Sequence, residues 1–271
     1  MKNGLILGIS SDIGSAIAHH WLERGFNVAG TYRNKSFKTS QLSDEGTKLF
    51  QLDLLSEESI DKFIVKYAAS GLKWDYLIVC PGTMTPVGPF SNTDFVKFKQ
   101  SINVNLIGPL QVVQGLLPYS SEIKLKPLIT FLSGGGTNGA PVNFSSYIIS
   151  KIALLKATEL LDAELEDFRT VIFGPGWIRT KIHDEVLQSK DSAPHAFMET
   201  ERRLLEDDFT PMSSVLQFVD WIIEQKKEVL AGRNFSSRDD PWFQKDFIEK
   251  LTRDTSLLKL RRHLHLKGQF K

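Results

Sequence analysis

The stretch Leu5-Ile-Leu-Gly-Ile-Ser-Ser-Asp-Ile-Gly-Ser-Ala-Ile-Ala18 decides the fold of this chain. A short apolar run ends in a turn that contains Gly8 and Gly14, and a helical pattern begins at Ser15. A glycine turn between a buried strand and a helix exposes backbone N–H groups at the positive end of the helix dipole, where a pyrophosphate can bind. The alternative is a loop that only needs glycine dihedrals, because short glycine patterns are frequent by chance.

Short apolar runs and stretches of helical periodicity alternate along the rest of the chain. This order predicts an α/β fold, a Rossmann-type doubly wound parallel sheet of about seven strands with helices on both faces. The predicted strands are residues 5–9, 27–32, 48–52, 76–80, 128–132, 170–173 and 229–231. One helix is predicted by apolar residues from Ile60 to Ala68, with Gly71 at its end, and another by Val215 to Ile223, with Ser213 or Ser214 as N-cap.

The composition excludes several classes of protein. The 271 residues are 41% hydrophobic, which is enough for a full core, and 33 basic against 32 acidic residues leave a net charge of +1. A nucleic-acid partner is therefore not expected. The single cysteine, Cys80, excludes an internal disulfide framework and a cysteine-rich zinc module, and we expect it to be buried and inert. No metal site is expected.

The N-terminal apolar run is too short for a signal peptide, because Ser10, Ser11 and Asp12 interrupt it. No apolar segment reaches the ~18 residues that a membrane-spanning helix needs. We therefore expect a soluble cytoplasmic protein without a membrane partner.

The expected domain organisation is a single Rossmann-type domain, residues 1–238, followed by a basic tail, residues 239–271. The domain includes a substrate lid at 181–212, whose polar part from 181 to 208 is weakly periodic and is expected to be mobile. His183, His195, Arg202 and Arg203 lie in this part, and they fit either a polar or phosphorylated ligand or an ordinary surface. The tail fits a solvated segment, or a contact with an anionic substrate or a neighbouring subunit.

The end of the second predicted strand bears on the choice of cofactor. It reads Gly30-Thr-Tyr-Arg-Asn34, with no acid to bind the ribose of NAD and with Arg33 available for the extra phosphate of NADP. NADP is therefore favoured over NAD, although a surface arginine would look the same. Asp53, after the third strand, is placed to contact the adenine edge, or else only forms a turn.

Tyr147 and Lys151 are four residues apart in a predicted helix, so they share one face. An ammonium beside a phenol favours the phenolate, which lowers the pKa of the tyrosine toward the range useful for proton transfer. Such pairs are common at solvated helix edges, and the pair alone is weak evidence for catalysis.

The chain resembles the short-chain dehydrogenase/reductase family, in its single-domain form, from Leu5 to about Phe235. Five segments carry the resemblance, in the family's order: Gly8 to Gly14, Cys80-Pro-Gly82, Asn103-Val-Asn-Leu-Ile-Gly108, the pair Tyr147 and Lys151, and Pro175-Gly-Trp-Ile-Arg-Thr180.

The resemblance implies hydride transfer between a nicotinamide and a small carbonyl or alcohol. Tyr147 would exchange the proton, Lys151 would lower the pKa of the tyrosine and bind the nicotinamide ribose, and Asn105 would hold a water that relays protons. The residues implied for the cofactor are Gly8, Ser10, Ser11, Asp12, Ile13, Gly14, Tyr32, Arg33, Asp53, Leu54, Pro81, Gly82, Tyr147, Lys151, Pro175, Gly176, Ile178 and Thr180.

The sequence departs from the family at the serine that donates to the substrate oxygen. That serine usually stands thirteen positions before the tyrosine, where this chain has Gly134, so Ser133 is one residue early. We expect Ser133 to take the role, because the glycines 134–136 that follow it allow the backbone to direct its side chain into the site. Alternatively Asn138 or Ser145 donates, or carbonyl reduction is impaired. Asp12 also replaces the middle glycine of the cofactor turn.

Three functions are compatible with the sequence. The favoured one is an NADP-dependent oxidoreductase. The second is a non-catalytic NADP-binding regulator of the same fold, which the glycine at position 134 motivates. The third is a sugar-modifying epimerase or dehydratase, for which the chain leaves little room after residue 181. In the family the helices near residues 105–117 and 147–161 pair between subunits, so we expect a homodimer or homotetramer.

Overall fold

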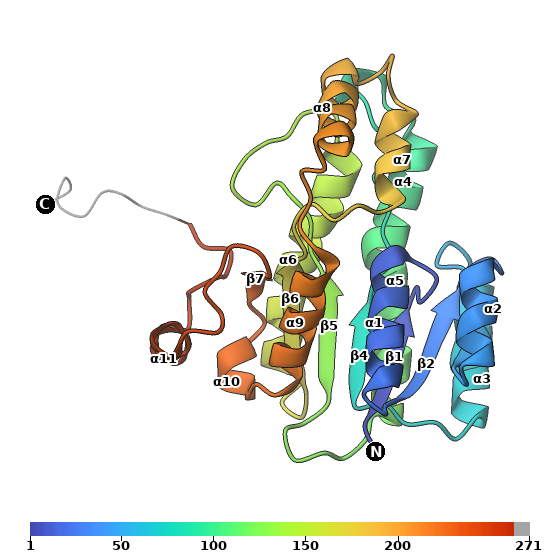
Figure 1. The fold of residues 1–271 in the computed structure, drawn as a ribbon, viewed down its shortest axis with the longest axis vertical. Helices are drawn as coiled ribbons and strands as arrows, with labels where there is room; N and C mark the ends of the chain where they lie inside the picture. Colours follow the sequence, from blue (N-terminus) through green and yellow to red (C-terminus); the bar gives the residue numbers. More distant parts are fainter. Residues whose placement is uncertain (263–271) are drawn as a thin grey trace, which may run out of the picture.

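The computed structural model of the protein describes residues 1–262 and contains one sheet of seven parallel strands (Figure 1). The strand order is β3-β2-β1-β4-β5-β6-β7. The strands are β1 (Asn3–Leu7), β2 (Asn27–Tyr32), β3 (Lys48–Gln51), β4 (Tyr76–Val79), β5 (Leu128–Leu132), β6 (Arg169–Gly174) and β7 (Asn234–Ser236). The order reverses direction between β1 and β4, and a doubly wound sheet binds its ligands at such a switch point.

Six of the seven predicted strands are confirmed, and the prediction for residues 229–231 is wrong. Val229 and Leu230 are buried, but they belong to the short helix α10 (Lys227–Leu230), which ends at Ala231 with a φ of 40°. The last strand lies three residues further on. A short buried apolar run does not distinguish a strand from one turn of helix, since both bury the same side chains.

Helices cover both faces of the sheet (Figure 1). On one face α1 (Asp12–Glu23) and α9 (Met212–Ile223) enclose a core that includes Trp21, Phe218 and alternate strand residues. On the other face α3 (Glu57–Ala69), α5 (Gly108–Leu116) and α6 (Ser145–Glu164) bury a second core around Phe63 and Phe131. The strands are buried on both faces, as their continuous apolar sequences predict.

The two helices predicted from apolar spacing are present as α3 and α9, and Gly71 follows α3 with a φ of 69°. The predicted N-cap of α9 is wrong. Pro211 is the N-cap, and Ser213 and Ser214 lie in the first turn. The fixed φ of proline suits the start of a helix, so no serine cap is needed there.

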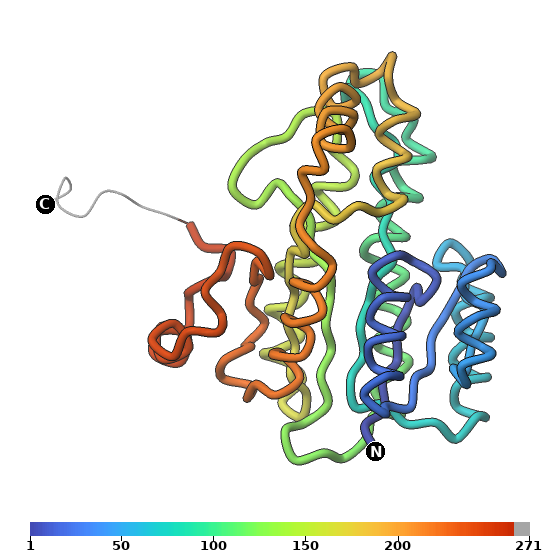
Figure 2. The backbone as a smooth tube through the Cα atoms, viewed as in Figure 1, coloured from blue at the N-terminus to red at the C-terminus, as the bar shows by residue number. Residues whose placement is uncertain are grey.

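The remaining helices lie above and beside the sheet. They are α2 (Phe37–Asp44), η1 (Phe90–Asn92), α4 (Phe95–Ile102), the π-helical turn η2 (Asn103–Ile107), η3 (Leu117–Tyr119), α7 (Ile182–Leu187), α8 (Pro194–Glu206) and α11 (Lys245–Arg253). The tube in Figure 2 shows α7 and α8 over the carboxyl edge of the sheet, where the connection from β5 to α6 also makes a wide arc. The predicted lid is therefore helical where the sequence shows only weak periodicity.

The buried side chain of Arg233 attaches the start of the tail to the body of the protein. Its guanidinium donates to the carbonyls of Glu228 and Val229 in α10, and to those of Leu251, Asp254 and Leu257 in or after α11. A cation at two helix C-termini satisfies carbonyls that lack partners within the helices. Of the basic residues predicted for the tail, His263, His265, Lys267 and Lys271 lie outside the described residues.

None of the helices in residues 1–262 combines the length and the apolar character required to cross a bilayer.

Candidate active site

A groove of about 1730 Å³ runs along the carboxyl ends of the strands, where the doubly wound topology predicts a ligand site. It brings together nearly all of the residues expected at the site. Those that line it are Gly8, Ser10, Ser11, Asp12, Ile13, Tyr32, Arg33, Asp53, Leu54, Pro81, Gly82, Ser133, Tyr147, Lys151, Pro175, Gly176, Ile178 and Thr180. Gly14 and Asn105 do not line the groove, but each forms a hydrogen bond with a residue that does, Gly14 with Ser11 and Asn105 with Thr83.

The glycine turn leaves two backbone donors without a partner in residues 1–262, and these are available to an anion. The Ser11 hydroxyl accepts the N–H of Gly14 at 3.0 Å, and its carbonyl accepts the N–H of Ser15 at 2.8 Å. A helix has four N–H groups without intrahelical partners at its start. The amides of Asp12 and Ile13 therefore remain, at the positive end of the α1 dipole, which fits a pyrophosphate.

Both glycines of the turn are needed for close packing. Gly8 has a φ of 71°, and a Cβ on it would lie 3.1 Å from the Pro81 ring, so the turn packs directly on the loop after β4. A Cβ on Gly14 would lie 2.5 Å from the Gly8 carbonyl oxygen. Because Gly14 has no side chain, α1 can begin in close contact with the turn. The role of Gly14 is therefore packing rather than contact with a ligand.

Asp12, which replaces the family's middle glycine, joins three segments at the edge of the groove. Its carboxylate pairs with Lys38 of α2 and accepts the Lys181 N–H at 2.8 Å. These contacts with Lys38 and Lys181 lower the pKa of Asp12, although burial opposes them. The start of the lid is thereby attached to the cofactor turn.

Arg33 is exposed at the groove and forms no ion pair with any residue of 1–262, so its guanidinium is available to a phosphate. Asp53 also lines the groove, but its carboxylate accepts the Leu55 N–H at 3.0 Å. Asp53 therefore forms a turn, and its contact with an adenine ring stays a prediction.

The Tyr147 side chain packs on the backbone of Gly134. A Cβ added to Gly134 would lie 2.2 Å from the phenol oxygen and 2.7 Å from Cζ. The glycine at the family's serine position therefore makes room for the tyrosine ring, and any side chain at residue 134 would displace it.

Tyr147 and Lys151 lie on one face of α6, as their spacing predicts, but the expected lowering of the phenol pKa is not found. Burial and the negative charge of Glu185 raise the pKa of Tyr147 to about 12, and burial lowers the pKa of Lys151 to about 8. The Lys151 amine donates to the Leu132 carbonyl at 2.8 Å and lies 5.9 Å from the centre of the phenol ring.

Ser133 is buried at the end of β5, and its hydroxyl lies toward β6. A Cβ on Gly174 would be 3.2 Å from the Ser133 Oγ. Of the two alternative donors, Asn138 lines the groove and Ser145 does not.

Asn105 connects three elements beneath the groove. Its amide accepts the Thr83 N–H at 2.8 Å and donates to the Thr83 carbonyl at 2.9 Å and to the Ser150 hydroxyl at 3.0 Å. It lies in the π-helical turn η2, and such turns are frequent at functional sites. The turn projects Asn105 toward the loop after β4 and holds that loop against α6.

Comparisons with known proteins agree with this geometry. The family model described as short chain dehydrogenase matches residues 2–191, which is most of the chain. The chain belongs to the short-chain dehydrogenase family. It is similar to a 3-amino-tetrahydro-pyrrolizinone reductase of Xenorhabdus hominickii, with 28% identity over 77% of this chain and 72% of that protein. It also resembles the benzil reductase ((S)-benzoin forming) of Bacillus cereus, with 22% identity over 70% of this chain and 80% of that one.

Solved structures share the fold. A short-chain dehydrogenase/reductase from Saccharomyces cerevisiae superposes with a TM-score of 0.77 at 18% identity, over 91% of this chain and 99% of that one. A short-chain dehydrogenase from Shigella flexneri, solved in complex with NADP, has a TM-score of 0.73 at 19% identity, over 88% of this chain and 97% of that one. The protein is thus an oxidoreductase of this family.

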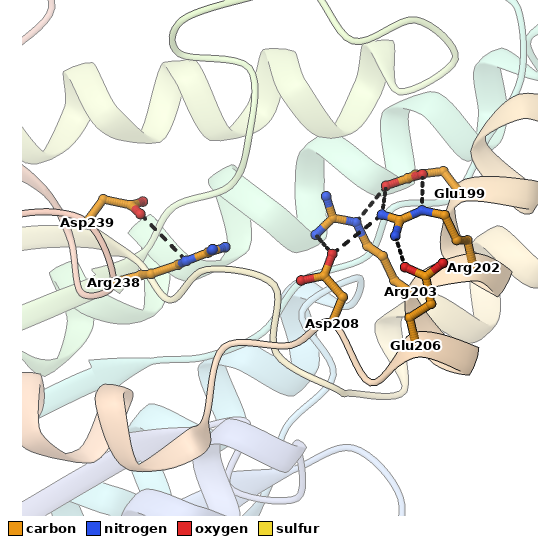
Figure 3. A network of polar contacts seen from close by, with 7 residues as sticks. All are labelled: Glu199, Arg202, Arg203, Glu206, Asp208, Arg238 and Asp239. Carbon is orange, nitrogen blue, oxygen red and sulfur yellow. Dashed lines mark hydrogen bonds and ion pairs between the residues drawn. The ribbon is translucent and has the colours of Figure 1, made fainter.

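The predicted lid of this short-chain dehydrogenase is held by an aromatic and ionic cluster. Trp177 stacks on the buried His183 with ring centres 3.8 Å apart, and the Arg203 guanidinium lies 4.9 Å from the Trp177 ring centre. Figure 3 shows Arg202 and Arg203 paired with acids of the same segment, Glu199, Glu206 and Asp208. These pairs support the surface interpretation of the two arginines over a role as ligands for an anion.

One residue of the groove carries no signal in the sequence. Glu185 of α7 reaches the loop after β4 and accepts hydrogen bonds from Thr83, Met84 and Thr85. It is one of many acids in a polar segment, and its partners are about a hundred residues away, so only the tertiary structure reveals this contact.

Proposed function

We propose that this short-chain dehydrogenase is an NADP-dependent oxidoreductase that interconverts a small carbonyl compound and its alcohol. When bound, the nicotinamide supplies or accepts the hydride. The observation that carries the proposal is the position of the Tyr147 hydroxyl, over Gly134 at the carboxyl end of β5 and in the same groove as the glycine turn.

Tyr147 is proposed as the general acid in carbonyl reduction. With a pKa of about 12 the phenol is protonated at neutral pH, and it can donate to an alkoxide because an alkoxide is a stronger base than a phenolate. Lys151 lies at the floor of the groove, 3.7 Å from the position of a Cβ on Gly82. There its amine can bind a ribose hydroxyl. Ser133 is proposed to support the substrate oxygen, and Asn105 to position the loop after β4 and a water for proton relay.

The residues present fit an NADP molecule. The amides of Asp12 and Ile13 suit a pyrophosphate, and Arg33, which forms no ion pair within residues 1–262, offers its guanidinium beside Tyr32 to a further phosphate. The NADP complex of the Shigella flexneri protein supports this choice of cofactor over NAD.

Ketones are the proposed substrates. Two of the relatives are named as reductases, one of a pyrrolizinone and one of benzil. The lid, residues 181–212, is proposed to cover the substrate, and residues 239–271 to form an appendage of the single domain 1–238. We further propose a homo-oligomer, because Ile107, Ile149 and Leu160 are each about half exposed on the helices expected to pair. Light scattering after size exclusion tests this last point.

Substitution of Tyr147 tests the function. Tyr147→Phe is expected to abolish ketone-dependent oxidation of NADPH while the NADPH dissociation constant, measured by fluorescence titration, changes less than about twofold. Tyr119→Phe, far from the groove, serves as the control. Retained turnover in Tyr147→Phe would refute the proposed role of the phenol.

A non-catalytic NADP-binding regulator remains the second candidate function, favoured by Gly134 in place of the serine. One measurement distinguishes such a regulator from a reductase. A regulator binds NADPH tightly but transfers no hydride from isotopically labelled NADPH to any member of a ketone and aldehyde panel.

A further inference from the structure

The carboxylate of Glu185 is fixed in place by an unusual set of donors. One oxygen, Oε2, accepts four hydrogen bonds: the Met84 and Thr85 N–H groups donate at 2.6 and 2.8 Å, and the Thr83 and Thr85 hydroxyls donate at 2.9 and 3.0 Å. All four donors are neutral. They hold the side chain in one orientation without cancelling the charge of the carboxylate.

No cation in the described part of the chain compensates that charge. Glu185 forms no ion pair within residues 1–262, and its second oxygen, Oε1, accepts no hydrogen bond there. Glu199, the other glutamate of the groove, differs because it is paired with Arg202 and Arg203. Glu185 therefore leaves a net negative charge and an open acceptor in the wall of the groove.

The Glu185 carboxylate and the Tyr147 phenol share one groove. Glu185 lines the same groove as Tyr147, and its negative charge contributes to the raised pKa of the phenol. Apolar side chains lie beside this carboxylate, because Met84 and Phe144, which line the groove, pack against the cluster that contains the buried Val186. An apolar wall strengthens the interaction between a carboxylate and a bound cation, since less water screens it.

We propose that Glu185 selects carbonyl substrates that carry a positively charged amino group. This inference rests on the proposed reductase function and narrows its substrate class. The Oε1 atom accepts from the substrate ammonium while the donors of Thr83, Met84 and Thr85 keep the carboxylate from turning away. A substrate with an anionic group at this point is repelled.

The competing explanation is that Glu185 only fastens the lid to the loop after β4. Glu185→Gln separates the two, because the amide oxygen still accepts from the loop but the charge is lost. Asp184→Asn is the matched control: it removes the same charge from the neighbouring residue of α7, which is exposed and does not line this groove.

The probes are para-aminomethyl acetophenone and para-ethyl acetophenone, which have nearly the same shape and differ in one positive charge. The measured quantity is the ratio of their kcat/KM values with NADPH. The wild-type ratio is expected to favour the ammonium compound and to fall about tenfold in Glu185→Gln, with no change in Asp184→Asn. A wild-type preference for the ethyl compound, or a ratio that Glu185→Gln leaves unchanged, overturns the proposal.

A binding measurement keeps this proposal separate from the proposed reductase function. If no ketone is reduced, the proposed reductase function is wrong. Calorimetry with benzylamine then tests the cation site at Glu185 independently of turnover. Benzylamine is expected to bind the wild-type protein and to bind Glu185→Gln about tenfold more weakly. Equal binding, or none to the wild type, contradicts a cation site at Glu185.

Discussion

The phenol oxygen of Tyr147 occupies the space in which a side chain of Gly134 would begin, 2.2 Å from the position of that Cβ. The tyrosine ring therefore packs directly on the backbone of Gly134. This relationship explains why the chain departs from its family at residue 134, because a serine and the observed tyrosine position are mutually exclusive. It also makes the glycine a positioning residue for the proposed general acid.

Gly134→Ala is expected to displace the Tyr147 ring and to lower kcat/KM about 100-fold, since misplacement of a reacting group by an ångström has effects of that size. The steady-state rate with NADPH and a ketone measures this. Gly135→Ala is the control, because a Cβ on Gly135 meets no atom within 4 Å. Equal activities of the two variants would contradict the positioning role.

Lys151 is expected to lose its proton near pH 8. Burial disfavours the ammonium, so its pKa falls from 10.5 to about 8. The folded state favours the neutral amine. The contribution of Lys151 to the unfolding free energy is therefore fully present only above pH 10.5 and is lost as the pH falls through about 8. Amine labelling followed by mass spectrometry, from pH 6 to 11, should show labelling of Lys151 with a midpoint near 8. A midpoint near 10.5 would show that burial does not control this amine.

Arg33 is expected to set the choice between NADPH and NADH. Arg33→Ala removes from the groove a guanidinium that has no ion pair in the described part of the chain. The dissociation constant of NADPH should therefore rise about tenfold while that of NADH stays nearly constant. Lys35→Ala, an exposed cation that does not line the groove, is the control. A wild-type preference for NADH would overturn the assignment of Arg33.

Arg233 is expected to be important for stability rather than for catalysis. Arg233→Met leaves carbonyls of α10 and α11 without their buried donor, which should lower the unfolding free energy by about 3 kcal/mol. Urea denaturation measures the change. Arg253→Gln removes an exposed ion pair with Glu249 and should change the unfolding free energy by less than ~0.5 kcal/mol. Similar effects of the two substitutions would show that burial of Arg233 does not increase its contribution to the unfolding free energy.

Most of the sheet could be predicted from the sequence because its strands are buried on both faces and read as continuous apolar runs. The failure at residues 229–231 has the same origin, since Val229 and Leu230 are buried equally well by one turn of helix. The helices α7 and α8 were not predictable from periodicity, because α7 makes contacts with residues about a hundred positions away, such as those of Glu185 with Thr83 and Thr85.

The sequence by itself determined the glycine turn, the order of strands and helices, the spacing of Tyr147 and Lys151 on one helix face, and the absence of an acid after β2. These features depend on residues that are close in the chain. Only the tertiary structure decided that Tyr147 packs on Gly134 and that Lys151 binds a carbonyl rather than lowering the phenol pKa. It also decided that Glu185 adds to the groove a charge that no ion pair within residues 1–262 compensates. Each of these depends on distances between segments far apart in the chain, and the ionisation of a buried group follows those distances and its exposure to water.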